Sequence, residues 1–166
     1  MKKLISVIGS DKSDENLSKY AIEVAEELGQ LIAKNNAILI CGGRGGIMEA
    51  VCRGAKINEG ITVGILPKSK TEVNDFVDIP IVTGLGNIRN SIIVYSSDAI
   101  VAIAGRWGTL NEISYSMIYE KPIILIKGTG GIVDYICNNI NTDFSYKTKV
   151  IIVDSAKEAI MKIFNK

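Results

Sequence analysis

The chain of 166 residues contains no histidine and only three cysteines. The lack of histidine excludes Ser-His-Asp and Cys-His catalysis and the common zinc sites. General acid–base chemistry would therefore fall to carboxylates, or to Lys, Tyr or Cys. Cys41, Cys52 and Cys137 form no Cys-x-x-Cys pair, and their odd number favours free buried thiols over disulfides or metal binding. No metal site is expected.

An excess of one charge sign and a long apolar run are also missing. Lys plus Arg (19) nearly equals Asp plus Glu (18), which argues against nucleic-acid and acidic-membrane binding. The apolar run at residues 4–8 follows two lysines, but it is too short for a signal peptide and is better interpreted as a first strand. We expect no membrane partner and a cytoplasmic location. The apolar fraction of 47%, rich in Ile and Val, is typical of a buried parallel sheet.

Apolar runs typical of β-strands alternate along the chain with stretches of helical periodicity. Strands are predicted at residues 4–8, 37–41, 61–66, 79–82, 98–104, 123–126 and 150–153, with a polar loop over 68–78. Helices are predicted from a cap at Ser13 or Asp14, and over 46–58, 88–97, 109–120, 132–139 and 156–164. This pattern predicts a Rossmann-like α/β fold, with three α/β/α layers around a mainly parallel sheet of about seven strands. Residues 1–166 are expected to form a single domain.

Two glycine-rich turns each follow a predicted strand and precede a predicted helix. They are Gly42-Gly43-Arg44-Gly45-Gly46 and Gly105-Arg106-Trp107-Gly108-Thr109. Helix N-termini offer unpaired N–H groups and the positive end of a dipole, and glycine lets a ligand approach the backbone. Together the turns predict a cleft for a phosphorylated ligand such as a nucleotide, at the carboxyl ends of the strands. Gly9 and Ser10, which end the first strand, belong to the same candidate set.

The first turn fits neither the usual Gly-x-Gly-x-x-Gly spacing nor a Walker A motif, because no Lys-Ser/Thr pair follows Gly46. Its glycines can serve a ligand, or they can only supply a backbone with positive φ. Arg44 has two corresponding interpretations, as a phosphate partner or as a solvated surface residue.

The second turn has two interpretations of equal weight. Thr109 and Glu112 fit a Thr-x-x-Glu capping box, in which neither residue performs chemistry. Alternatively, Thr109 and the amides after Gly108 bind phosphate, and Glu112 points its carboxylate into the cleft. Arg89 lies at the rim of that cleft, at the start of its own helix. Asp98 begins a strand at the far end of the sheet and is interpreted as structural.

These motifs resemble those of the LOG-like proteins of the SLOG superfamily, also labelled lysine decarboxylase-like. Residues 37–51 are similar to the family run Gly-Gly-Gly-x-x-Gly-Leu-Met, and residues 63–68 to its third strand. Arg89 and residues 105–112 resemble the family pattern Arg…Pro-Gly-Gly-x-Gly-Thr-x-x-Glu, in register. The resemblance covers nearly the whole chain.

The resemblance implies a nucleotide-binding domain with phosphoribohydrolase activity. Such an enzyme cleaves the N-glycosidic bond of a nucleoside 5′-monophosphate into free base and ribose 5-phosphate. The loop at residues 105–109 would hold the phosphate, and Arg89 and Glu112 match the two catalytic positions. A carboxylate can stabilise positive charge on the ribose or orient water. No cofactor is expected to be required, and no Schiff-base lysine for a decarboxylase is visible.

The chain also departs from the LOG pattern. Ala104 replaces the family proline, Arg106 its second glycine, and Cys41 the first glycine of the other turn. Asn87 and Asn90 stand where LOG enzymes usually place His and Lys. The chain thus resembles more closely a less characterised branch, some of whose relatives are described as molybdenum-cofactor carriers. The alternative expectation is a non-catalytic carrier or sensor of a phosphorylated ligand of the molybdopterin type.

The resemblance further implies a homodimer or homotetramer, with the cleft near the subunit interface. Apolar residues on the two helices after position 88 can form such an interface, or they can only pack the core. They are Ile92, Ile93, Tyr95, Tyr115, Met117, Ile118 and Tyr119.

Overall fold

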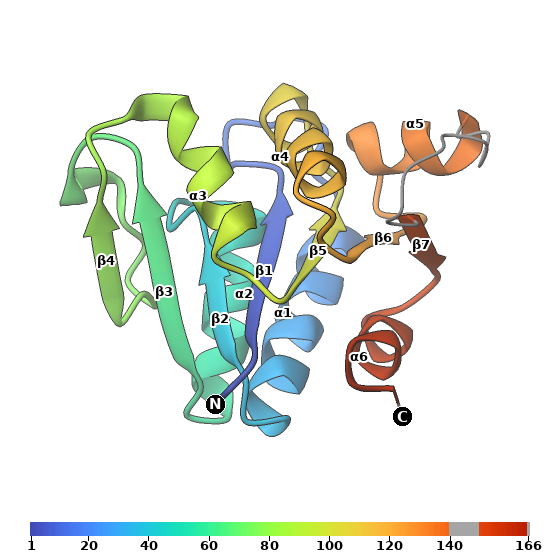
Figure 1. The fold of residues 1–166 in the computed structure, drawn as a ribbon, viewed down its shortest axis with the longest axis horizontal. Helices are drawn as coiled ribbons and strands as arrows, with labels where there is room; N and C mark the ends of the chain where they lie inside the picture. Colours follow the sequence, from blue (N-terminus) through green and yellow to red (C-terminus); the bar gives the residue numbers. More distant parts are fainter. Residues whose placement is uncertain (140–149, 166) are drawn as a thin grey trace.

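The computed structural model describes residues 1–139 and 150–165, in which strands and helices alternate (Figure 1). The strands are β1 (Leu4–Gly9), β2 (Ile38–Cys41), β3 (Ile61–Leu66), β4 (Ile79–Val82), β5 (Ala99–Ile103), β6 (Ile123–Ile126) and β7 (Val150–Val153). The α-helices are α1 (Lys19–Lys34), α2 (Ile47–Ile57), α3 (Asn90–Tyr95), α4 (Trp107–Ile118), α5 (Gly131–Asn139) and α6 (Ala156–Phe164). Two 3₁₀ helices, η1 (Lys70–Glu72) and η2 (Gly86–Arg89), precede β4 and α3.

The seven strands form one sheet in the order β4-β3-β2-β1-β5-β6-β7. Every neighbouring pair is parallel, which confirms the expected Rossmann-like α/β class. The chain winds outward from β1 to β4 and then returns to place β5 on the other side of β1. Ligands bind at such a switch point, beyond the carboxyl ends of the strands. The topology therefore directs attention to the loops after β1 and β5.

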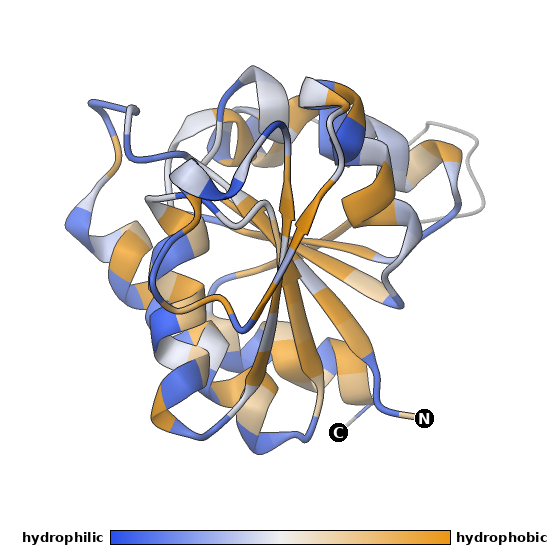
Figure 2. Ribbon diagram, turned by 90° about the vertical axis from the view of Figure 1, so that its left-hand side faces the viewer, coloured by the Kyte–Doolittle hydropathy of each residue, from blue (hydrophilic) through white to orange (hydrophobic). Residues whose placement is uncertain are grey.

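Helices cover both faces of the sheet, because alternate residues of each strand point to opposite faces. Ile5 and Val7 of β1 pack in a cluster with α1, α2 and α6, whereas Ile8 packs in a second cluster with α3, α4 and α5. Figure 2 shows the apolar strands in the interior and the polar residues on loops and outer helix faces. The result is the three-layer arrangement that the sequence predicts.

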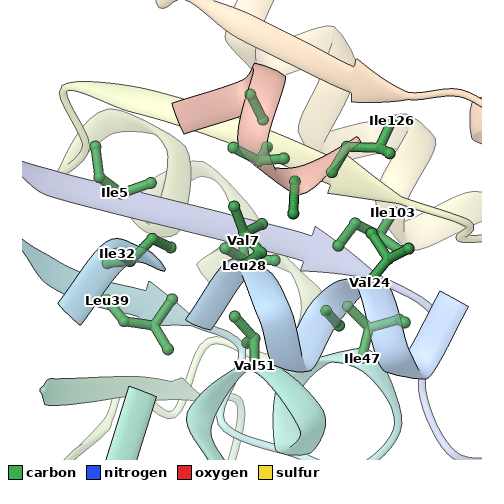
Figure 3. Packing of buried hydrophobic residues seen from close by; sticks show 14 of the residues in the cluster. Ile5, Val7, Val24, Leu28, Ile32, Leu39, Ile47, Val51, Ile103 and Ile126 are labelled. Atoms are coloured by element: carbon green, nitrogen blue, oxygen red, sulfur yellow. The ribbon is translucent and has the colours of Figure 1, made fainter. Parts of the chain in front are cut away.

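Two glycines let α1 and α2 approach closely beneath the sheet. A Cβ on Gly29 would lie 2.0 Å from the Val51 carbonyl oxygen, and one on Gly54 would lie 2.0 Å from that of Glu26. Figure 3 shows Leu28 and Val51 packed against the strand residues of the same cluster. Glycine is required at both helix positions because any side chain would separate the helices.

Several predicted boundaries are wrong for local reasons. Ser18, and not Ser13 or Asp14, caps α1, and its side chain accepts the Ala21 N–H. Asp14 is unavailable because its carboxylate already accepts hydrogen bonds from Ser10 and Asn16. The expected polar loop at 68–78 contains a 3₁₀ turn, and the helix expected from 88 begins as the 3₁₀ helix η2.

Asp98 has the structural role that the sequence indicates. Its Oδ2 accepts the Leu4 N–H at 2.8 Å, and its own N–H donates to the Leu4 carbonyl at 2.8 Å. The residue thus joins the amino ends of β1 and β5, far from the switch-point loops. Among the described helices, none is long and apolar enough to cross a bilayer.

The apolar residues of α3 and α4 divide between core and surface. Ile93 is fully buried, whereas Tyr95 and Ile118 are 68% and 63% exposed. The Tyr119 ring stacks on the Tyr115 ring, with 5.6 Å between the ring centroids, and it meets the Tyr95 ring edge-on at 5.2 Å. Part of the predicted surface is therefore core, and part remains an exposed apolar patch.

Candidate functional site

A cavity of about 310 Å³ lies at the switch point, between the loops that follow β1, β2 and β5. Most of the predicted ligand-binding residues line it: Gly9, Ser10, Gly42, Arg44, Arg89, Arg106, Gly108, Thr109 and Glu112. The lining does not include Gly43, Gly45, Gly46 or Gly105. Gly45 and Gly46 instead allow close contact with the loop after β1, Gly43 allows close contact with β3, and Gly105 leaves room for the Thr109 side chain.

The loop after β1 is fastened to the second glycine turn. Ser10 Oγ accepts the Gly105 N–H at 2.8 Å and donates to the Asp14 carboxylate at 2.6 Å. The Ser10 carbonyl accepts the N–H of Ile47, the first residue of α2. One residue thus links the strands β1 and β5 and helix α2 around the cavity.

Hydrogen bonds of the Gly43 backbone hold the first glycine turn in place. The Gly43 N–H donates to Cys41 Sγ at 3.3 Å, and the Gly43 carbonyl accepts the Asn74 N–H at 2.9 Å. Cys41 Sγ lies 3.5 Å from Cys52 Sγ, and all three cysteines of the chain are free thiols, as predicted. The Gly43 amide therefore points into the protein, where it fixes the turn.

Arg44 lines the cavity with a side chain that is only partly exposed, and its role as a phosphate partner stays a prediction. Its Nε lies 3.4 Å from a carboxylate oxygen of Asp11 and 3.4 Å from one of Glu72. The Asn74 side chain also donates to the Arg44 carbonyl at 2.8 Å. Arg44 therefore clamps two loops together at the edge of the cavity, with its charge already balanced by two acidic groups.

The N-terminus of α4 opens into the cavity. The helix begins at Trp107, with Arg106 as a cap that makes no side-chain hydrogen bond. Thr109 is thus the third helical residue and not the N-cap, so the capping-box interpretation of Thr109 and Glu112 is wrong. The first-turn N–H groups have no partner inside the helix and carry the positive end of its dipole. This geometry suits an anion.

Arg89 is the most unusual side chain of the cavity. It is 6% exposed, and Nε and Nη1 are buried with no hydrogen-bond partner in the described structure. The guanidinium lies against Gly42, where a Cβ would come within 2.9 Å of Nη1. Burial lowers the pKa of Arg89, while the nearby Glu112 raises it. Unpaired buried donors of this kind are rare and mark functional sites.

Glu112 faces the same cavity from one turn further along α4. It is 8% exposed, and no described hydrogen bond involves its carboxyl group. Burial raises the pKa of Glu112 to about 8, although the charge of Arg89 acts in the opposite direction. At neutral pH most molecules therefore hold a neutral carboxylic acid beside a buried cation.

A third glycine turn, at residues 128–131, resembles an anion site but is already occupied. The Asp134 carboxylate accepts the N–H groups of Gly128 and Gly130, at 2.7 and 3.0 Å. Thr129 Oγ accepts the Ala104 N–H at 2.9 Å, which braces the second turn from behind. In residues 1–139 and 150–165, no group of three His, Cys, Asp or Glu is placed to hold a metal ion.

Sequence reasoning missed several lining residues. Asp11 and Asp14 follow β1, Met48 begins α2, and Asn87 and Trp107 lie at the mouth. Asp11 had a detectable signal, since it follows closely after the first strand, whose carboxyl end borders the predicted cleft. Met48 matches the methionine of the family run, but its apolar side chain at a helix start did not by itself indicate a ligand site.

The fold is thus that of Rossmann-like three-layer α/β proteins, and the cavity occupies the place where such folds bind ligands. Residues 2–160 match the model of the SLOG cluster4 family, and the chain belongs to that family. The resemblance to LOG-like proteins is therefore confirmed.

Relatives of this chain include molybdenum-cofactor proteins and a phosphoribohydrolase. A molybdenum cofactor binding protein from Rippkaea orientalis is 39% identical, with a TM-score of 0.89 and coverage of 99% of this chain and 97% of the other. The Moco carrier protein of Chlamydomonas reinhardtii is 34% identical, with a TM-score of 0.85 and the same coverage. A cytokinin riboside 5′-monophosphate phosphoribohydrolase from Mycobacterium tuberculosis is 30% identical, over 84% of this chain and 83% of that protein.

Proposed function

We propose that the chain binds a phosphorylated heterocyclic compound of the molybdenum-cofactor kind in this cavity and carries it without breaking it down. The observation that supports this most strongly is Arg89, whose buried Nε and Nη1 have no partner. The Arg89 side chain lines the cavity, and so does the N-terminus of α4. A bound phosphate would supply the opposite charge and a hydrogen-bond acceptor for the guanidinium.

The free-energy cost of burying the Arg89 guanidinium explains why an anion suits this cavity. A buried hydrogen-bond donor without a partner costs about 1–3 kcal/mol, and a buried charge costs more. Phosphate accepts charge-assisted hydrogen bonds from guanidinium and is stabilised at helix N-termini. Arg44 adds little positive charge because Asp11 and Glu72 neutralise it. Arg89 and the α4 amides are therefore the expected phosphate partners.

The raised pKa of Glu112 argues against hydrolysis that depends on an ionised carboxylate. Stabilising a ribosyl cation, or activating water, needs an ionised carboxylate. Burial raises the pKa of Glu112 to about 8, and a bound phosphate would raise it further by charge repulsion. The chain contains no histidine that could replace it as a base. The similarity to two molybdenum-cofactor proteins points in the same direction.

Hydrolysis of a nucleoside 5′-monophosphate is the second candidate, and one observation favours it. A neutral carboxylic acid with a raised pKa is typical of a general acid, so Glu112 could protonate the leaving base. Arg89 faces the same cavity, and the Mycobacterium tuberculosis relative is named for this reaction. In this case the role of Glu112 is proton donation and not cation stabilisation.

One preparation tests both candidates. The purified protein is denatured under oxidising conditions, and the released material is analysed for a phosphorylated pterin and for molybdenum. The native protein is incubated with AMP and assayed for free adenine. Carriage predicts pterin and no adenine. Adenine release that is lost in Glu112→Gln, from protein without pterin, would instead establish the second candidate. Failure to bind pterin, AMP and inorganic phosphate would contradict both.

Replacing Arg89 should have opposite effects on phosphate binding and on folding stability. We expect Arg89→Met to weaken phosphate binding at least tenfold, since charge-assisted hydrogen bonds contribute about 1.5–3 kcal/mol. The same change removes a buried unpaired cation and should raise the stability of the empty protein. Isothermal titration with inorganic phosphate and urea unfolding measure the two effects. Arg53→Met, which removes a half-exposed arginine paired with Glu26, is the control that should leave phosphate binding unchanged.

We further propose that the chain forms a homodimer through α3 and α4. Tyr95 and Ile118 expose most of their surface, and Ile88 on the adjoining η2 is 66% exposed. Burying such a patch against its copy would remove apolar surface from water. Light scattering should report a dimer for the native chain and a monomer for the double variant Tyr95→Glu, Ile118→Asp. A native monomer at micromolar concentration would refute this proposal.

A further inference from the structure

A shallow slot continues from the cavity around the N-terminus of α4 to α5. Arg106 and Trp107 line both spaces. Gly105, Gly131, Ile132 and Tyr135 complete the slot, which has a volume of about 280 Å³. The two spaces thus share a wall, and a ligand held at the start of α4 can extend into the slot.

The slot carries two large aromatic side chains that packing does not explain. Trp107 is 79% exposed and Tyr135 is 65% exposed, although each belongs to a helix that packs on the sheet. Trp107 is the first residue of α4, so its backbone lies in the amide turn while its indole stands outside. A flat group stacked on that indole would lie directly beside a phosphate on the turn.

The floor between the two aromatic residues is rigid. The Ile132 N–H donates to the Gly105 carbonyl at 2.8 Å, and the Val133 N–H donates to the Ala104 carbonyl at 3.1 Å. Gly131 has φ +60°, and a Cβ there would lie 2.4 Å from the Gly105 oxygen. These contacts fix the start of α5 against the residues that precede α4, and Gly131 adds no side chain between them.

The charge next to the slot also favours a small anionic ligand. The Arg106 side chain is exposed and forms no ion pair or hydrogen bond with the side chains or backbone of the described residues. The slot is of small-molecule size and opens from the proposed phosphate site. Aromatic residues beside a cation suit a planar ring attached to a phosphate, since rings stack on aromatic faces and guanidinium attracts anions.

We propose that Trp107 and Tyr135 flank a stacking subsite for the planar heterocycle of the phosphorylated ligand. This inference rests on the proposed function, because the phosphate on α4 places the ring. The cavity beside Arg89 and Glu112 then holds the remainder of the ligand. The subsite takes nucleobases or pterins alike, because every such ring has a π-face to stack.

Trp107 is the only tryptophan of the chain, so tryptophan fluorescence reports on ligand binding at the slot. Intrinsic fluorescence is followed during titration with AMP, neopterin monophosphate, ribose 5-phosphate and inorganic phosphate, and affinities are measured by isothermal titration. We expect one or both ring compounds to quench Trp107 and to bind more tightly than ribose 5-phosphate. Ribose 5-phosphate and phosphate should bind without comparable quenching.

Substitutions of Trp107 and Tyr135 test whether the slot is responsible for the tighter binding of the ring compounds. Trp107→Ala and Tyr135→Ala should each weaken binding of the ring compound roughly tenfold, the loss expected for one stacked ring. Both should change ribose 5-phosphate affinity by less than about twofold, since neither removes a phosphate partner. Trp107→Phe keeps a ring and should retain most of the affinity. Tyr20→Ala, which removes a half-exposed tyrosine from α1, is the control that should bind like the native chain.

The outcomes separate this inference from the proposed function. If none of the four compounds binds, the proposed function fails. If the ring compounds bind no more tightly than ribose 5-phosphate, or bind Trp107→Ala as well as the native chain, the subsite is refuted while phosphate binding stands. The subsite is also refuted if Trp107→Ala converts an oligomer into a monomer, since a second copy of the chain would then occupy the slot.

Discussion

Replacing Glu112 by glutamine should remove most of the pH dependence of folding stability near neutrality. The carboxyl group is buried, and its pKa is about 8 in the folded chain against an ordinary value of 4.5. A raised pKa means that the folded state holds its proton over a range in which the unfolded chain has released it. The contribution to stability is therefore complete below about pH 4.5 and declines as the pH rises through 8.

The size of the effect follows from the same two values. Between the pKa values of the unfolded and the folded chain, the free energy of unfolding should fall by about 1.4 kcal/mol per pH unit. From about pH 5.5 to about pH 8.5 this amounts to roughly 3 kcal/mol. The chain has no histidine, so few other side chains titrate in that interval. Glu112→Gln keeps the shape of the side chain and cannot ionise.

Urea unfolding at several pH values measures the difference. The native chain should lose stability steadily toward alkaline pH, whereas Glu112→Gln should stay nearly constant and become the more stable protein above about pH 8. Glu23→Gln, an exposed glutamate of α1, is the matched control and should follow the native chain. Equal pH dependence in the native chain and Glu112→Gln would show that Glu112 is ionised in the folded protein, and would remove the support that the raised pKa of Glu112 gives to carriage.

Two further predictions concern the framework of the site. Gly54→Ala would place a Cβ 2.0 Å from the Glu26 carbonyl, so we expect thermal unfolding to show a loss of several kcal/mol, as for other forced core contacts. Ser10→Ala would leave the buried Gly105 N–H without its acceptor. It should cost about 1–3 kcal/mol in urea unfolding and also weaken phosphate binding. Native stability in either variant would contradict the corresponding contact.

Much of the site could be located from the sequence because its signals are local. A glycine cluster after a Val- and Ile-rich run marks the carboxyl end of a buried strand, wherever the strand lies in the sheet. The pattern therefore placed residues 42–46 and 105–109 at one edge of a parallel sheet. It also identified Arg89 and Glu112 as candidates, and both line the cavity.

The chemical state of those residues could not be predicted in this way. Whether Arg44 is free depends on Asp11 and Glu72, which belong to other loops. The third glycine turn has the composition of an anion site, yet Asp134 fills it. The Arg44 contacts depend on which loops meet in space, and the Asp134 contacts depend on the local backbone conformation, which composition alone does not give.

The order of apolar and polar residues was sufficient by itself to determine the α/β class, the strand and helix order and the edge of the sheet that carries the site. These features follow from periodicities of two and 3.6 residues, which each segment expresses alone. Only the tertiary structure decided that Nε and Nη1 of Arg89 are buried without a hydrogen-bond partner, that burial raises the pKa of Glu112, and that Trp107 and Tyr135 are exposed in the same slot. Desolvation and charge are set by neighbours from distant parts of the chain, so they exist only once the chain has folded.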